Sequence, residues 1–204
     1  MTSKTHCAVG TAATLLILPP DNWKEFLICM GTASIGSCIC DIDVSSSNSH
    51  KGLSRLLTAV AIAAVIIFLL NFVFHIGIIN AIKSNSTILQ FLIGFALFLA
   101  ICIFGKRQPH RSFMHSVIAV AAISFSVYIM IPSAVGYVIV SMSSHIILDL
   151  LNRRDVQLFY PSKFGQFSLG LFPASGKADK VFFVIGCIGI VFGMTNFCVN
   201  YFLK

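Results

Sequence analysis

Long apolar segments alternate with short polar interruptions along the whole chain. The apolar segments lie at about 7–18, 26–40, 56–80, 88–104, 115–131, 134–148 and 181–203. Because a helix needs roughly 20 apolar residues to cross a bilayer, the pattern predicts an all-α, polytopic membrane helix bundle. We expect about six or seven segments in one membrane-embedded domain over residues 1–204, ending in a transmembrane helix at 181–203. The first, second, fourth and sixth segments are short, so they are expected to tilt, re-enter or be covered by neighbours.

The composition excludes an ordinary soluble globular protein. Of the 204 residues 57% are hydrophobic and only 10% are charged, whereas a soluble domain carries about 25% charged residues. The seven cysteines form an odd set that falls mostly in the apolar runs, without the loop spacing of a disulfide framework. We therefore expect most of them to be small packing residues.

Fourteen Lys and Arg residues stand against seven Asp and Glu residues, which gives a formal charge of +7. If the segments alternate in direction, one side of the membrane carries Lys4, Lys51, Arg55, Lys106, Arg107, Arg111, Arg153, Arg154, Lys163, Lys177 and Lys180. The other side carries Lys24, Lys83 and Lys204. By the positive-inside rule the first side is cytoplasmic, which predicts that the N-terminus lies inside and the C-terminus outside. Most of the bases lie in short loops between apolar segments rather than in one basic patch, so no nucleic-acid partner is expected.

Most of the histidines and several aspartates lie where apolar segments meet this predicted cytoplasmic face. His6 opens the first segment. Asp41 and Asp43 end the second, His110 and His115 precede and open the fifth, and His145 and Asp149 close the sixth. Four separate stretches thus bring four imidazoles and three carboxylates to one membrane face.

Each of these residues also has an ordinary interpretation. The Asp pair could end a helix and solvate a turn, and His6 alone could be a surface histidine. His145 and Asp149 share a helix face, so they could form a simple ion pair or a metal-bound histidine with a carboxylate partner. His110 is expected in the loop after Pro109, with His115 in the first helical turn of the fifth segment.

Membrane depth favours a functional interpretation, since ionisable groups there are costly and usually serve a function. Imidazoles and carboxylates without converging thiolates suit zinc, or a similar metal such as manganese or iron. Seven candidate ligands exceed what one tetrahedral ion takes, so two or three ions are expected.

These residues also carry a resemblance to a known family. Thr5-His6, Gly36-Ser37 with Asp41-Ile42-Asp43, His110-Arg111 with His115-Ser116, Gly136-Tyr137, Ser144-His145 with Asp149, and Tyr160-Pro161 follow one another in the order of that family's motifs. Over residues 4–170 the chain resembles the YdjM-like, LexA-regulated, membrane-bound metal-dependent hydrolases. It is more distantly similar to the zinc-dependent phospholipase C and P1 nuclease superfamily, which favours a phosphoester substrate. Cys40, Ser112, Met114, Asn152 and Asp155 depart from the family pattern, and none of these departures removes a candidate ligand.

The resemblance implies an inner-membrane hydrolase in which His6, Asp41, Asp43, His110, His115, His145 and Asp149 hold the metal ions. A metal-activated water would attack a phosphoester or related ester of a lipid-like substrate at the cytoplasmic face, with Asp41, Asp43 and Arg111 as the catalytic residues. Arg111 suits phosphate, although it could also be an ordinary membrane anchor. His50 could be a spare ligand, a proton shuttle or a solvated loop residue. Ser47 could orient the Asp pair, and His75 is expected to be a packing or interface residue.

Other functional classes remain open at this point. The aromatic-rich loop from Leu150 to Lys180 could be a lid over the site or an amphipathic connector on the headgroups. A transporter could use the same His/Asp cluster as an ion or proton relay, and it would then spread polar residues across the bilayer. A non-catalytic membrane assembly protein would bind no metal.

Overall fold

A computed structural model describes residues 1–74, 77–162, 164, 166–173 and 175–203. Its helices are α1 (Ser3–Ile17), α2 (Trp23–Ile39), α3 (Asn48–Phe74), α4 (Ile78–Ser84), α5 (Ser86–Lys106), α6 (Val117–Met130), α7 (Val135–Leu150) and α8 (Lys177–Phe202). Short 3₁₀ turns are η1 (Cys40–Asp43), η2 (Phe113–His115) and η3 (Pro132–Ala134). Strands β1 (Val156–Gln157) and β2 (Gln166–Phe167) pair antiparallel. The predictions for His75, Lys163 and Lys204 fall outside the described residues.

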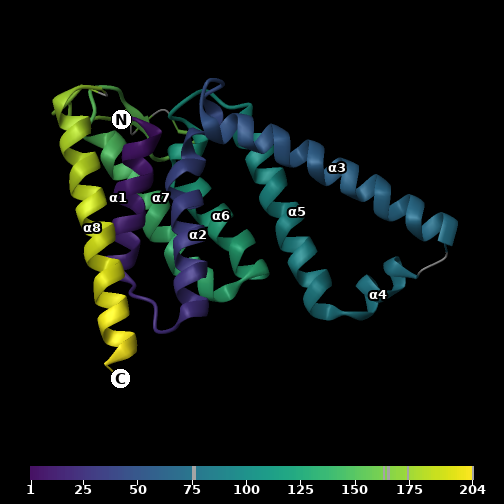
Figure 1. The fold of residues 1–204 in the computed structure, drawn as a ribbon. Coiled ribbons are helices and arrows are strands. Elements are labelled where there is room, and N and C mark those ends of the chain that lie inside the picture. Colours follow the sequence, from purple (N-terminus) through teal and green to yellow (C-terminus); the bar gives the residue numbers. More distant parts are fainter. Residues whose placement is uncertain (75–76, 163, 165, 174, 204) are drawn as a thin grey trace.

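The predicted all-α bundle is confirmed. Helices α1, α2, α7 and α8 lie side by side, with α6 packed between α7 and α5. Figure 1 shows the N-terminus at one end of the bundle, together with the loops that precede α3, α6 and α8, and the C-terminus at the other end. Residues from distant parts of the sequence therefore meet at the N-terminal end.

Within the part of the chain that the structure describes, five helices are long and apolar enough to cross a membrane: Trp23–Asp43, Asn48–Phe74, Ser86–Lys106, Pro132–Leu150 and Lys177–Phe202. The second, fourth and sixth segments, which the hydropathy pattern predicts to be short, gain length from polar residues and 3₁₀ turns at their ends. Helix α6 has 14 residues and α1 has 15, so these two remain shorter than a full span.

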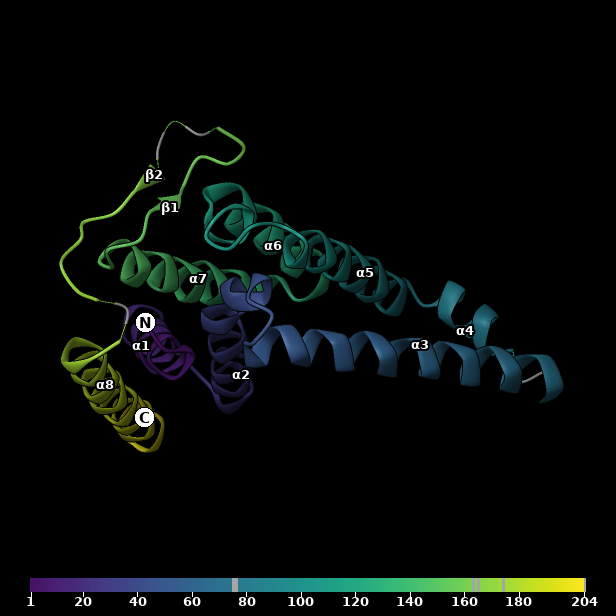
Figure 2. The same ribbon diagram turned by 90° about the horizontal axis from the view of Figure 1, so that it is seen from above.

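The third predicted segment is divided rather than continuous to residue 80. Helix α3 ends at Phe74, and α4 begins at Ile78 after Gly77, whose φ of 75° is left-handed. Glycine adopts this conformation without steric cost, which explains the break. Helices α3 and α5 extend away from α1, α7 and α8 (Figure 2), and the most apolar stretch of α3 has no buried residue in the described structure.

Small residues let the helices that carry the polar cluster approach closely. A side chain at Gly10 of α1 would collide with Ser37 of α2, and one at Gly36 would collide with Ser141 of α7. Such small-residue contacts are typical of helix packing in membranes, where apolar burial does little to hold helices together. They fix α1, α2 and α7 relative to one another at the end where the polar residues lie.

All seven cysteines are free thiols, and Cys29, Cys40 and Cys102 are buried in the apolar core. This agrees with a packing role for these three.

Candidate metal centre

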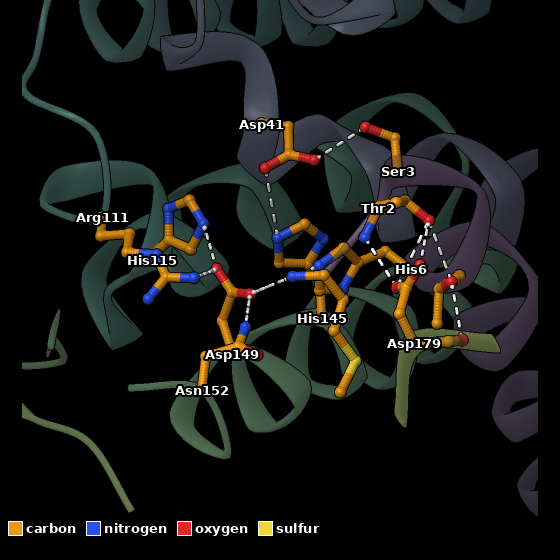
Figure 3. Close-up of polar contacts among 12 residues, drawn as sticks. Thr2, Ser3, His6, Asp41, Arg111, His115, His145, Asp149, Asn152 and Asp179 are labelled. Carbon is orange, nitrogen blue, oxygen red and sulfur yellow. Dashed lines mark hydrogen bonds and ion pairs between the residues drawn. The ribbon is translucent and has the colours of Figure 1, made fainter. Parts of the chain in front are cut away.

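The structure brings all seven predicted ligands together at the N-terminal end of the bundle. His6 lies in the first turn of α1, and the two aspartates of η1 follow α2. His110 lies in the loop after α5, His115 in η2, and the remaining pair in the last turns of α7. The ring of His115 therefore comes from a 3₁₀ turn before α6, not from the first turn of that helix. Figure 3 shows most of the cluster.

One group of potential ligands consists of His6, His145 and Asp149, all buried. The His6 and His145 rings stack with their centroids 3.7 Å apart. The Asp149 carboxylate lies 3.4 Å from Nε2 of His6 through one oxygen and 3.4 Å from Nε2 of His115 through the other.

A second group consists of Asp41, His110 and His115. Asp43 lies beside it, with one carboxylate oxygen 2.9 Å from Nδ1 of His110 and the other 3.6 Å from Nδ1 of His115. Asp41 approaches Nε2 of His145 at 3.6 Å, so the two groups adjoin. This arrangement has room for two cations.

Local hydrogen bonds hold the turn that carries the two aspartates. The hydroxyl of Ser47 donates to the backbone carbonyl of Asp41 (2.6 Å). The ring of His50 bonds through Nδ1 to the carbonyl of Ile42 (2.9 Å). Ser47 thus contacts the backbone of the Asp pair rather than a carboxylate, and His50 belongs to neither ligand group.

The distances between imidazole nitrogens and carboxylate oxygens in the cluster test whether a metal ion fits between them. Direct hydrogen bonds between nitrogen and oxygen are about 2.7–3.2 Å long. Two ligands of a tetrahedral zinc ion, each about 2.0–2.1 Å from the metal, lie about 3.4 Å apart. Four imidazole–carboxylate pairs in the cluster have separations of 3.4 to 3.6 Å. The separations match atoms that share an ion better than atoms that hydrogen-bond to each other.

Buried ring nitrogens that have no hydrogen-bond partner among the described residues give a second test. They are Nδ1 of His6, both ring nitrogens of His115 and Nε2 of His145. Nδ1 of His145 lies 2.6 Å from the carbonyl oxygen of Ser37. A carbonyl can only accept, so Nδ1 donates and the Nε2 lone pair of a neutral ring faces the cluster. A backbone partner that fixes the tautomer is typical of metal-binding histidines. The residues therefore fit a divalent cation.

The carboxylates also determine the protonation of His115, which precedes α6 and is completely buried. Burial alone would lower its pKa, but the nearby carboxylates of Asp149 and Asp43 raise the pKa to about 9. Without a cation, this imidazole carries a positive charge between two carboxylates. A bound metal ion would have to displace that proton.

Arg111 connects two of the three carboxylates. Its guanidinium contacts Asp149 at 3.1 Å and donates to the carbonyl of Arg154 (2.6 Å), while its backbone N–H donates to Asp43 (3.3 Å). The residue has a left-handed φ of 65°, which costs a non-glycine residue about 1–2 kcal/mol. Arg111 is 7% exposed and therefore belongs to the cluster rather than to the membrane surface.

Several residues that contact or position the candidate ligands have no clear signal in the sequence. Asn152, a departure from the family pattern, is buried and donates to Asp149 (2.8 Å). Ser3 donates to Asp41 (3.0 Å). Asp179 of α8 accepts from the backbone N–H (2.9 Å) and the hydroxyl (3.1 Å) of Thr2, and so holds the start of α1 near His6 (Figure 3). The sequence offers only one signal for Asp179, which is that it is one of just seven acidic residues in the chain.

A polar cavity of about 390 Å³ opens beside the cluster, lined by Ser3, Asp41, His110, Arg111 and Asp149, among others. A second cavity of about 480 Å³ adjoins it at His110 and Arg111. The segment between α7 and α8 forms one wall through Gln157 and Tyr160, and its Phe164 is 91% exposed. Whether this segment acts as a lid stays a prediction.

Comparison with known proteins places the chain in a family. No curated protein and no solved structure matches it. The family model described as YdjM inner membrane protein matches residues 1–202. With its apolar helices and this match over nearly the whole chain, the protein is a membrane protein and belongs to the YdjM inner membrane protein family.

Proposed function

We propose that the protein is a metal-dependent hydrolase of the inner membrane. It would cleave a phosphoester or related ester of a lipid-like substrate at the cytoplasmic face. The observation that carries this proposal is the convergence of four imidazoles and three carboxylates from α1, η1, the η2 region and α7. Burying so many ionisable groups at the end of an apolar bundle is costly unless they bind a charged partner.

Zinc is the cation that suits this donor set best, with manganese or iron as alternatives. Bound there, it would lower the pKa of a water molecule toward neutrality and polarise an ester oxygen. The chain's own residues supply the remaining functions. Asp41 and Asp43 would accept a proton from that water, and Asn152 and Ser37 orient the Asp149 and His145 ligands.

Three features support a phosphate-bearing substrate near the cytoplasm. Arg111 lines both polar cavities, and a guanidinium matches phosphate oxygens in geometry and charge. Most of the Lys and Arg residues in the described segments lie at the end of the bundle that holds the cluster, with Lys24 and Lys83 at the opposite end, and the positive-inside rule assigns the end richer in bases to the cytoplasm. The order of the His and Asp motifs also resembles that of the zinc-dependent phospholipase C and P1 nuclease superfamily.

Elemental analysis of the purified full-length protein tests the metal. We expect about two zinc ions per chain in the wild type and a clear loss in His115→Ala and Asp149→Ala. Asp21→Ala serves as the control, because Asp21 is an exposed acid before α2 at the other end of the bundle. Metal at background level in the wild type would refute the proposal.

A substrate screen tests the reaction. Phospholipid vesicles and a soluble aryl phosphodiester are incubated with the zinc-loaded wild type and with a chelator-treated sample. Release of phosphate or of a phosphorylated headgroup that stops with the chelator supports hydrolysis. Metal-dependent ion flux into sealed vesicles without any hydrolysis would replace the proposal with a transporter.

A further inference from the structure

An apolar groove of about 560 Å³ lies next to the candidate metal centre. It is formed by residues of α1, α2, α3 and α5, including Cys7, Ile35, Ile39, Leu53, Leu56 and Phe98. The groove is part of neither ligand group. It lies where α3 diverges from the rest of the bundle, and only Leu53 of α3 is buried in the described structure.

The groove connects the metal centre with the membrane interior. Ser3 and Asn48 line both the groove and the polar cavity, and Ser3 donates to Asp41. Below the groove, a second apolar cavity of about 310 Å³ shares Ile35 and Phe98 with it. The two cavities therefore adjoin, and together they form an apolar track that starts beside the polar centre and ends between α2, α5 and α6.

The length of this track can be compared with the bilayer. Along α2 and η1 it extends from Ile42 to Thr32, which is about 15 Å at roughly 1.5 Å per residue. The hydrocarbon core of a bilayer is about 30 Å thick. The track thus has the depth of one leaflet.

We infer that this track binds a hydrocarbon chain of a membrane phospholipid whose phosphate ester lies over the His/Asp cluster. The inference rests on the proposed hydrolase function and specifies its substrate as a long-chain, phosphate-bearing lipid. The lipid enters sideways from the leaflet, between α3 and α5. Lys4 lines the groove near its polar end, where its ammonium group can meet the lipid phosphate.

A lipid chain fits the track better than a helix of another protein. Polar side chains, Ser3, Lys4 and Asn48 among them, line the groove where it meets the cluster, whereas the second cavity is lined almost wholly by apolar side chains. A phospholipid has the matching combination of a charged headgroup and an apolar chain.

Photo-cross-linking tests the inference without depending on turnover. The full-length, zinc-loaded protein is reconstituted in phosphatidylcholine nanodiscs that contain a long-chain phosphatidic acid with a diazirine near the end of one chain. After illumination, mass spectrometry locates the label. We expect labelled peptides from α2 around Thr32–Ile39 and from α5 around Phe95–Cys102. Label spread evenly over the lipid-facing helices, α8 included, would overturn the inference.

A matched pair of variants on one helix sharpens the test. Ile35 lines both apolar cavities and is 60% exposed, so Ile35→Trp obstructs the track without overpacking the core. Leu27, two turns earlier on α2 and 67% exposed, lines neither cavity. We expect Ile35→Trp to reduce labelling of the track roughly tenfold, a change of about 1.4 kcal/mol in binding, and Leu27→Trp to leave it unchanged. Equal labelling in the two variants would contradict the inference.

The same samples separate this inference from the proposed function. If the label lies in the track but the wild type does not turn over any phospholipid, the hydrolase proposal fails and the lipid site stands. If phospholipids are hydrolysed while the label lies elsewhere, the hydrolase stands and the lipid site fails.

Discussion

Replacing Asp149 with asparagine is the sharpest test of the metal centre. The carboxylate is 2% exposed and lies 3.4 Å from His6, 3.4 Å from His115 and 3.1 Å from Arg111. Asparagine keeps the shape of the side chain but removes its charge and one anionic ligand. We expect Asp149→Asn to lose the ion held with His6 and His145 and to keep the ion held with Asp41.

The expected rise of Tm with zinc follows from the linkage between metal binding and folding. A metal that binds only the folded protein, at a free concentration of 100 times its Kd, stabilises the protein by about 2.7 kcal/mol per site. In a chain of this size about 1 kcal/mol raises Tm by about 2–4 °C, so each zinc ion should raise Tm by about 5–11 °C. The wild type gains this increment from two sites, whereas Asp149→Asn gains it from one.

The assay compares the Tm of detergent-solubilised protein with saturating zinc and with chelator. The difference between the two conditions cancels any effect of the substitution on the metal-free protein. Asp21→Asn, at the far end of the bundle, controls for the loss of a carboxylate as such. The reasoning is refuted if zinc raises the Tm of Asp149→Asn as much as that of the wild type.

Two further predictions concern the position of α1 at the metal centre and the protonation of His115. Asp179→Ala removes the acceptors that hold Thr2 at the start of α1. Because hydrogen bonds to a charged group contribute about 1.5–3 kcal/mol, we expect zinc affinity at the His6 site to weaken about tenfold or more, and a calorimetric titration indistinguishable from wild type would contradict this. For the metal-free protein, the raised pKa of His115, about 9 against 6.5, contributes stability that is complete below pH 6.5 and is lost as the pH rises through 9. In chelator, Tm should fall over this range, and His115→Asn should flatten the fall; equal falls in both proteins would argue against the assignment.

The sequence was sufficient to predict which residues meet, because their places follow from chain direction alone. Helices that run alternately up and down bring the start of α1, the end of α2, the region before α6 and the end of α7 to the same end of the bundle. The length of each apolar segment and the position of each polar residue at its end determine this result.

The pairing within the cluster could not be predicted. Which carboxylate faces which ring depends on helix rotation and on backbone contacts such as that between His145 and Ser37. Asp179 approaches Thr2 only because α8 packs against α1. The hydropathy pattern does not predict the break before α4, because it averages over many residues and a single glycine changes it little. The left-handed backbone of Gly77 nevertheless interrupts the regular helix.

The distribution of charge along the helices favours a reaction at one face over a path across the membrane. A relay that moves ions or protons needs ionisable groups at successive depths. The apolar parts of the bundle, residues 7–17, 26–40, 56–74, 86–105, 116–131, 135–144 and 181–203, contain no Asp, Glu, His, Lys or Arg. Thr14 and Ser126, buried in α1 and α6, use their hydroxyls on carbonyls of their own helices. The cluster thus has an apolar helix bundle on one side and polar cavities on the other, which fits the proposed reaction on a lipid phosphate at this face better than a path across the membrane.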